Sequence, residues 1–253
     1  MSALRLSRPA EGVALAEIDN PPANALGSVM RGRMNALLDE LEADLSVRAV
    51  VLTGRGKTFC TGDDLREAAA RGAVSPAAVA DFNAMLDRIE RFRAPIVAAV
   101  NGHCVGGGLE VALSCDIRLA STAASFTAAG VNVGLMASAY RLPRVIGVAQ
   151  AKAMLLTGSP VLADAALANG LVTAVHEPQD LMGAAVALAS RIASRAPLSV
   201  EATKRIAGRA LDMDPAEAAK AMAAEIAVLS ASDDHAGAVT AFAERREPTF
   251  RRR

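Results

Sequence analysis

IVAAVNGHCVGGGLEVALSC, residues 96–115, runs from an apolar stretch through a glycine-rich loop into a helical pattern. Its first five residues, 96–100, have the composition of a buried β-strand. Three consecutive glycines, Gly106 to Gly108, stand where a helix should begin, and Glu110 follows as the one carboxylate of the stretch. A strand that leads through a loop into a helix is the repeating unit of α/β folds, so this stretch predicts that class.

The same alternation precedes this stretch. Apolar runs at 13–18 and 50–54 are predicted strands, and the segments 28–45 and 76–92 are predicted helices. Strands separated by segments of crossover length predict parallel pairing. In the first helix, apolar residues at three- and four-residue spacings define the predicted buried face: Val29, Met34, Leu37, Leu38, Leu41 and Leu45.

The last quarter of the chain has a different pattern. From Asp180 onward the sequence is Ala-rich and helical, with interruptions at Pro197, at Asp214 and Pro215, and at Pro248. We therefore expect a helical C-terminal region whose Ala-rich faces pack either within the chain or against another subunit.

The composition excludes several classes of protein. With 253 residues, 52% of them apolar, the chain can bury one substantial core, in one large domain or two unequal ones. Lysine plus arginine equals aspartate plus glutamate at 27 each, which gives no overall electrostatic reason for a nucleic acid or membrane partner. Three cysteines without metal-ligand spacing fit a reducing compartment, so we expect a cytoplasmic protein. Neither a signal peptide nor a membrane-spanning segment is predicted.

The glycine loop favours binding of an anion or an oxyanion. Backbone N–H groups at a helix N-terminus carry partial positive charge, and missing side chains let a ligand approach them. A second loop, 55–65, places Gly62 after the strand 50–54 and before another predicted helix. Two such loops can direct two amides at one oxygen, as the enolate of a thioester requires. The alternative is that the glycines only allow a tight turn against a packed neighbour.

Glu110 lies one turn into the helix that follows the glycines. There its carboxylate would be near the reacting carbon, in apolar surroundings that raise its pKa toward a range useful for acid/base catalysis. The alternative is that this first-turn glutamate only complements the helix dipole. The sequence leaves both interpretations open.

Seven segments, in order along nearly the whole chain, resemble the crotonase (enoyl-CoA hydratase/isomerase) superfamily. They are NPPANAL (20–26), FCTGDDL (59–65), PIVAAVNGHCVGGGLEVALSCDIRLAS (95–121), YRLPRVIG (140–147), LLTG (155–158), ALANGLV (166–172) and FAERREPTF (242–250). The resemblance implies an α/β fold in which residues 1–195 form a spiral of ββα turns that binds acyl-CoA. Residues 196–253 would form a helical trimerisation region, giving a homotrimer or a dimer of trimers.

The resemblance also implies roles for individual residues. The backbone N–H groups of Asp63 and Gly107 would form the oxyanion hole, and Glu110 would be the first of two catalytic carboxylates. Substrate and coenzyme A would contact Ala23, Thr61, Gly62, Asp64, Leu65, Gly106 and Arg245. The ligand would be an acyl-CoA thioester, with coenzyme A as part of the substrate and no metal or redox cofactor.

The sequence departs from the pattern of this superfamily at the second carboxylate. In the hydratases a second glutamate follows the first by twenty positions, and here that position is Gly130. No carboxylate occurs between Asp116 and Asp164, and the turn at 134–144 is shortened. Tyr140, the one tyrosine, lies in this turn and could supply a hydroxyl, although a buried packing role is favoured for it.

Three functions remain open. The first is hydration or isomerisation of an enoyl-CoA with Glu110 as the acid/base, which requires the carboxylate of Asp63 to point away from the oxyanion or to be paired. The second is a non-catalytic or nearly inactive acyl-CoA binding protein, which Gly130 favours. The third is another thioester reaction on the same two amides, such as decarboxylation or C–C cleavage.

Overall fold

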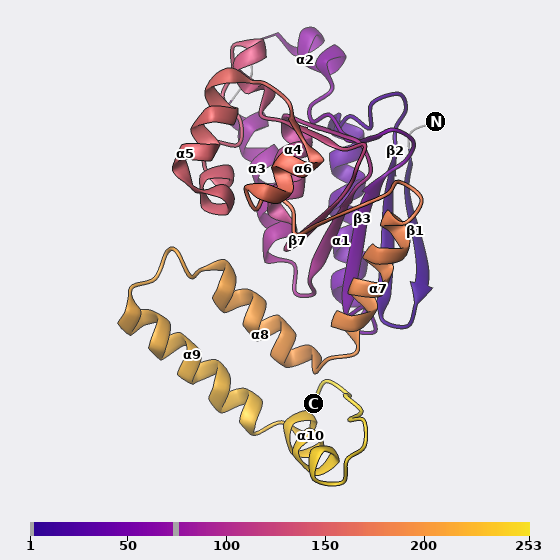
Figure 1. The fold of residues 1–253 in the computed structure, drawn as a ribbon, viewed down its shortest axis with the longest axis vertical. Helices are drawn as coiled ribbons and strands as arrows, with labels where there is room; N and C mark the ends of the chain where they lie inside the picture. Colours follow the sequence, from indigo (N-terminus) through magenta and orange to yellow (C-terminus); the bar gives the residue numbers. More distant parts are fainter. Residues whose placement is uncertain (1–2, 73–75) are drawn as a thin grey trace.

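The computed structural model describes residues 3–72 and 76–253, and its strands form two mixed sheets (Figure 1). The larger sheet has the order β1 (Ala3–Ala10), β2 (Val13–Asp19), β3 (Ala49–Gly54), β5 (Ile96–Val100), β7 (Ile117–Ser121) and β10 (Ala174–His176). The smaller sheet has the order β4 (Thr58–Cys60), β6 (His103–Val105), β8 (Ser125–Thr127) and β9 (Val161–Leu162). The predicted α/β class is confirmed.

Parallel pairing holds for the predicted central strands. β2, β3, β5, β7 and β10 pair in parallel, and so do β4, β6 and β8. The antiparallel pairs are β1 with β2 and β8 with β9. The strands of the smaller sheet span only two or three residues, too few for a sequence period to reveal, so this sheet was not predicted.

Successive turns of the chain each contribute one strand to each sheet and then a helix. β3 and β4 precede α2 (Leu65–Arg71) and α3 (Pro76–Arg91), β5 and β6 precede α4 (Gly107–Ser114), and β7 and β8 precede a short 3₁₀ helix at Ala129–Val133 and α5 (Arg141–Thr157). This is the expected spiral of ββα turns. α2 and α4 therefore begin shortly after the ends of β4 and β6, and that edge of the smaller sheet carries the two glycine loops.

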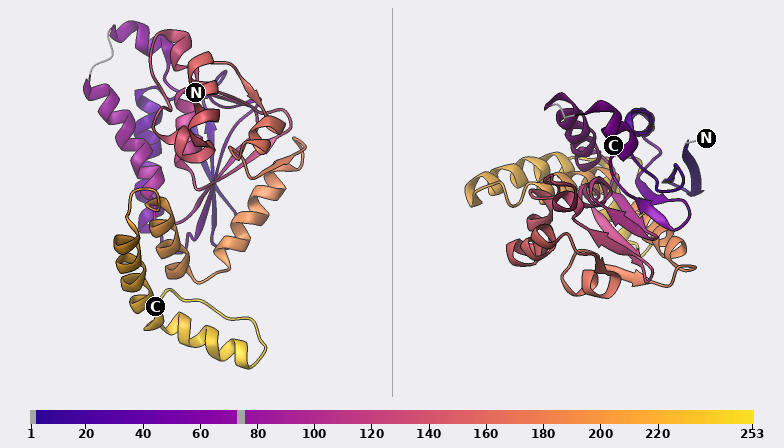
Figure 2. Two further views of the ribbon diagram at one scale, coloured as in Figure 1. Left: turned by 60° about the vertical axis from the view of Figure 1, so that its left-hand side comes forward. Right: turned by 90° about the horizontal axis from the view of Figure 1, so that it is seen from above.

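Helices cover both faces of the larger sheet (Figure 2). One face packs on α1 (Ser28–Ala43), α3 and α4 through alternate strand residues such as Leu52 and Ala98. The intervening residues, such as Val51 and Val97, pack on α7 (Leu181–Ala193), while α6 (Ala163–Ala168) follows β9. Because successive side chains of a strand point to opposite faces, both faces of this sheet are apolar.

The buried face of α1 is centred differently from the prediction. Met30, Met34, Leu37, Leu38 and Leu41 are buried. Val29 is 60% exposed, because it lies about 100° around the helix from Met30. Leu45 is 56% exposed, because α1 ends before it, at Ala43. The prediction for these two residues was wrong.

Three helices follow the spiral: α8 (Pro197–Gly208), α9 (Pro215–Ser230) and α10 (Asp233–Ala243). They extend away from the two sheets (Figure 1). Two of the predicted interruptions are helix starts, since Pro197 and Pro215 each occupy a first turn, where proline is well tolerated, whereas Pro248 lies in the coil after α10. None of the residues of α9 is buried in the single chain. Within the described residues, no helix is both long and apolar enough to span a bilayer.

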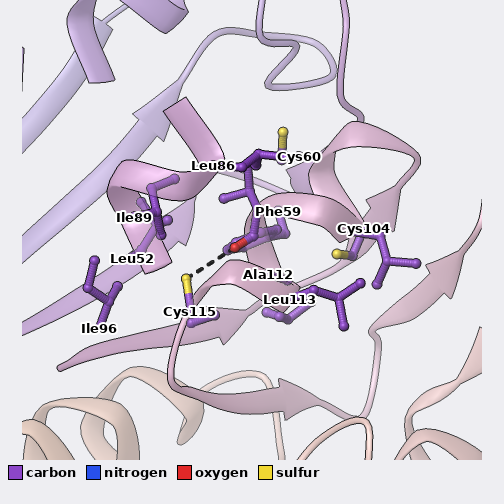
Figure 3. Close-up of a cluster of buried hydrophobic side chains, with 14 of the residues drawn as sticks. Leu52, Phe59, Cys60, Leu86, Ile89, Ile96, Cys104, Ala112, Leu113 and Cys115 are labelled. Atoms are coloured by element: carbon purple, nitrogen blue, oxygen red, sulfur yellow. Dashed lines mark hydrogen bonds between the residues drawn. The ribbon is translucent and has the colours of Figure 1, made fainter. Parts of the chain in front are cut away.

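The three cysteines lie in the core beneath α4 (Figure 3). Burial raises the pKa of Cys60 and of Cys115 to about 12, and that of Cys104 also well above its usual range. The thiol of Cys115, the residue that follows α4, donates to the carbonyl of Val111 in that helix at 3.3 Å. These thiols therefore stay protonated and serve as packing groups that support α4.

Candidate active site

The two glycine loops meet backbone to backbone. A Cβ built on Gly62 would lie 2.7 Å from the Cα of Gly107, and a Cβ on Gly107 would lie 3.0 Å from the Cα of Gly62. The same Cβ on Gly107 would lie 3.5 Å from the amide nitrogen of Asp63. The backbone amides of Asp63 and Gly107 are therefore neighbours, at the point where β4 leads toward α2 and α4 begins.

Packing accounts for part of the glycine triplet. A Cβ on Gly108 would collide with the carbonyl oxygen of Cys60, so α4 lies directly on β4. Gly62 has a φ of +82°, a backbone conformation that favours glycine. The tight-turn interpretation and the amide interpretation are thus compatible, because the same close approach brings the amides together.

The carboxylate of Asp63 is paired. Its Oδ1 lies 3.2 Å from Nη1 of Arg31, a buried residue of α1. The same guanidinium lies 3.2 Å from Asp81 of α3 through its Nε. Pairing with Arg31 meets the requirement that the charge of Asp63 be balanced beside the two amides.

Other predicted substrate residues surround these loops. The Thr61 hydroxyl donates to the carbonyl of Ala23 at 3.0 Å, and the Gly106 N–H donates to Thr127 at 2.9 Å. Asp64 caps α2 by accepting a hydrogen bond from the backbone N–H of Arg66 at 2.8 Å. The side chains of Thr61 and Asp64 thus each have a structural role at these positions.

Two further predicted contacts lie at the surface. Leu65, the first residue of α2, is exposed. Arg245 follows α10 at the opposite end of the molecule from α2 (Figure 1). Within one chain, the structure therefore does not bring Arg245 to the glycine loops.

Glu110 projects from the first turn of α4 and is largely buried, with its side chain 14% exposed. Its Oε1 accepts a hydrogen bond from the backbone N–H of Ser138, and its Oε2 lies 3.7 Å from Nη1 of Arg141. Burial raises the pKa of Glu110 above its usual range, and the Ser138 N–H and the Arg141 charge oppose that rise only in part. A carboxyl group with a raised pKa holds its proton more readily, which suits it to accept and then return a proton.

The shortened turn lies directly over Gly130. A Cβ at this position would lie 2.7 Å from the Ala137 nitrogen and 2.9 Å from the Leu135 carbonyl oxygen. The Leu135 N–H also donates to the Gly130 carbonyl at 2.8 Å. Glycine at position 130 and the short turn therefore fit each other, and a larger side chain there requires a different turn.

Arg141, the first residue of α5, joins this turn to α3. Its guanidinium lies 2.7 Å from Asp87 and 3.1 Å from Glu90, in addition to its approach to Glu110. Its neighbour Tyr140 is 62% exposed, with the Arg144 guanidinium 5.1 Å from the centre of its ring. The prediction of a buried Tyr140 was wrong, because the short turn ends at the surface.

A cleft of about 950 Å³ separates α3 and the start of α5 from α8 and α9. Its lining is mixed in charge: Asp87, Glu90, Arg91, Phe92, Tyr140, Arg141, Lys204, Arg205, Ile206, Gly208, Arg209, Asp212, Ala221, Ala224, Glu225 and Val228. The cleft thus borders Arg141, and none of its lining residues belongs to the glycine loops.

Comparison with known proteins settles the family. Residues 8–253 match the sequence model of the enoyl-CoA hydratase/isomerase family. The chain belongs to the enoyl-CoA hydratase/isomerase family. It is 36% identical over 241 residues to the short-chain-enoyl-CoA hydratase of Clostridium acetobutylicum, with 93% of this chain and 92% of that protein covered. It is 39% identical over 245 residues to the (E)-benzylidenesuccinyl-CoA hydratase of Thauera aromatica, covering 94% of this chain and 95% of that one.

Solved structures agree with the family. An enoyl-CoA hydratase from Bacillus anthracis superposes with a TM-score of 0.94 at 28% identity, over 99% of each chain. An enoyl-CoA hydratase from Mycobacterium smegmatis gives a TM-score of 0.91 at 32% identity, over 98% of each chain. The fold is therefore the crotonase fold that the sequence predicted.

Sequence reasoning about this family member missed two residues of the site. Ser138 and Arg141 both contact Glu110, yet neither was predicted to do so. The available signal was the shortened turn at 134–144, because a shorter connection must bring the start of α5 closer to α4. The sequence did not show onto which residue that turn would fold.

Proposed function

We propose that this protein catalyses hydration or isomerisation of an enoyl-CoA thioester. The single observation that carries the proposal is the contact of Gly62 with Gly107 beside the helix that bears Glu110. The Asp63 and Gly107 N–H groups would donate to the thioester oxygen as it gains negative charge, which lowers the barrier to the enolate. Membership of the family and the coenzyme A thioesters named for its relatives support this substrate class.

In isomerisation, Glu110 would take the proton at C2 of a 3-enoyl-CoA. The C–H electrons move into the enolate, the double bond shifts, and Glu110 returns the proton to C4. In hydration, the oxygen of water adds to C3 of a 2-enoyl-CoA while C2 gains a proton. Isomerisation needs one carboxyl group that reaches both carbons, whereas hydration must also activate water.

A second candidate is an acyl-CoA binding protein with little or no catalysis. Gly130 supports it, since the short turn leaves no room there for a second carboxylate. The hydrogen bond from Ser138 to Glu110 supports it as well, because that turn covers one oxygen of the carboxylate. The retained Glu110, with its pKa raised by burial, favours the enzyme.

The deciding experiment incubates a short trans-2-enoyl-CoA and a 3-enoyl-CoA with the protein in D₂O and follows their masses. The Glu110→Gln variant is the test, and Glu225→Gln, at a half-buried glutamate of α9 that pairs with Arg205, is the matched control. Gain of one D₂O establishes hydration, and deuterium without added water establishes proton shuttling. Both should require Glu110, whose loss should cost about 10²- to 10⁴-fold. Because Glu110 could return the same proton to C4 without exchange with solvent, chromatography also follows conversion of the 3-enoyl-CoA to the 2-enoyl-CoA. Binding with neither conversion nor mass change supports the second candidate.

We also propose that residues 1–195 bind the acyl-CoA and that residues 196–253 form an oligomerisation region, in a homotrimer or a dimer of trimers. Apolar side chains that one chain leaves exposed on α9 and α10 support this: Met222, Ile226, Val228, Val239 and Phe242. Burying such side chains favours association. In an assembly, Arg245 could reach a ligand held by a neighbouring chain. Light scattering of the full chain, beside Ile226→Glu, tests the assembly.

A further inference from the structure

Two groups outside the glycine loops fix the carboxylate of Glu110. The backbone N–H of Ser138 donates a hydrogen bond to Oε1, whereas Oε2 is buried without such a bond among the described residues. Among the residues that the structure describes, neither Oε2 nor the Ser138 hydroxyl has a hydrogen-bond partner of good geometry, although the hydroxyl lies close enough to help lower the pKa of Glu110. The guanidinium of Arg141 lies 3.7 Å from Oε2 through its Nη1.

Arg141 is itself held by two carboxylates of α3. Asp87 and Glu90 lie one turn apart on α3 and hold its Nη2 and Nε at 2.7 and 3.1 Å. The third nitrogen of the guanidinium, Nη1, faces Glu110. Since a guanidinium is planar and always charged, two fixed nitrogens determine where the third one lies.

We propose that Arg141 is a positioning residue that orients Glu110 and keeps its carboxylate ionised for proton transfer. This inference rests on the proposed function of Glu110 and deepens it. In this chain the shortened turn takes the space of a side chain at Gly130 and in the same step brings the start of α5 to the remaining acid. Arg141 touches Glu110 from outside the oxyanion hole, so it acts through that residue.

The other charged groups around Glu110 do not replace Arg141. On α3, Asp87 and Glu90 face the guanidinium, and in the loop after β4 the carboxylate of Asp63 is paired with Arg31. β4 and β6 contribute the thiols of Cys60 and Cys104, which stay neutral. Arg141 is the cation whose charge lowers the pKa of Glu110 against the effect of burial.

The test compares Arg141→Gln and Arg141→Lys in the full chain, with Arg144→Gln as matched control. Arg144 lies one helical turn further along α5 and pairs with Asp212 of the C-terminal region. The fold should tolerate Arg141→Gln, because Asp87 and Glu90 are half exposed and can be hydrated. The first readout is the pH dependence of deuterium exchange at C2 of the acyl-CoA. The second is the NMR titration of the ¹³C-labelled carboxyl group of Glu110, whose resonance is identified by its absence from the spectrum of Glu110→Gln.

With Arg141→Gln, the acid limb of the exchange rate and the Glu110 titration should both move to higher pH. Maximal exchange should fall on the order of 10- to 100-fold, as for a displaced base. Arg141→Lys should restore the limb at least in part, and Arg144→Gln should leave both curves in place. A Glu110 titration that does not move in Arg141→Gln overturns the proposal, whatever happens to the rate. Undiminished exchange in Glu110→Gln instead overturns the proposed function, while the titration still decides the role of Arg141.

Discussion

The backbone of Gly62 lies against the backbone of Gly107, so that a methyl group on Gly62 would come within 2.7 Å of the Cα of Gly107. These residues are 45 positions apart in the sequence. They belong to two successive ββα turns of the spiral, and their contact makes the amides of Asp63 and Gly107 neighbours. The geometry of the proposed oxyanion site therefore depends on two residues that lack side chains.

Replacing Gly62 with alanine should separate these two amides. We expect turnover to fall by about 10²- to 10³-fold, the effect of losing one donor in comparable oxyanion sites. Gly56→Ala is the matched control, because Gly56 has a similar φ of +79° but open space around its Cβ position. Turnover and thermal unfolding of both variants check this. Equal losses of activity would mean that backbone strain, and not the amide geometry, causes the effect.

Replacing Gly130 with glutamate should not by itself produce an efficient hydratase. The new side chain would meet the backbone of Leu135 and Ala137, so the turn must shift or the fold must lose stability by about 1–3 kcal/mol. Gly208→Glu, at an open position in α8, is the control for the added charge. Denaturant unfolding and the hydration assay in D₂O measure the two effects. A gain in hydration activity without loss of stability would contradict this, because it would mean that the turn over position 130 can rearrange at little cost in free energy.

Ser138→Gly should retain the contact with Glu110 and full activity within about twofold. Ser138 has a φ of +61°, which glycine adopts without strain, and the variant keeps the backbone N–H that donates a hydrogen bond to Glu110. Ser138→Pro removes that N–H and cannot adopt a positive φ, so it should reduce exchange at C2 strongly. Deuterium exchange distinguishes the two variants. Loss of activity in Ser138→Gly would assign a direct role to the hydroxyl.

Glu110→Gln should make the fold more stable at neutral pH, relative to the wild type, than at pH 4. Burial raises the pKa of Glu110 in the folded state, so the folded protein retains a proton that the unfolded chain has lost. Stability of the wild type therefore falls as the pH rises from the ordinary glutamate pKa through the higher folded pKa, and glutamine lacks that decline.

Glu225→Gln should show the opposite sign, since Arg205 lowers the pKa of Glu225. In that case the stabilisation by the carboxylate is present above the ordinary glutamate pKa and is lost as the pH falls through the lower folded pKa. Denaturant unfolding of both variants at pH 4 and pH 8 tests the pair. The same sign in both would mean that Glu110 is not held at a raised pKa.

Local patterns were sufficient for the class of fold. The apolar runs at 13–18, 50–54 and 96–100 became β2, β3 and β5, and the glycines before Glu110 became the start of α4. These elements can be predicted from residues close together in the sequence, because strands and helices have characteristic spacings of apolar residues and helices often begin at proline or glycine. The strands of the smaller sheet are too short to have a period, and only their pairing in space defines them.

The sequence by itself determined the α/β class, the family and the two glycine loops, because each depends on short stretches of chain. The tertiary structure alone decided that the turn before α5 closes over Gly130, that Ser138 and Arg141 hold Glu110, and that Tyr140 faces solvent. Glu110 and Ser138 are 28 positions apart, and no spacing rule links residues on different elements. Which loops meet is fixed by the packing of the whole spiral, since the burial of every helix on the sheets determines where each loop lies.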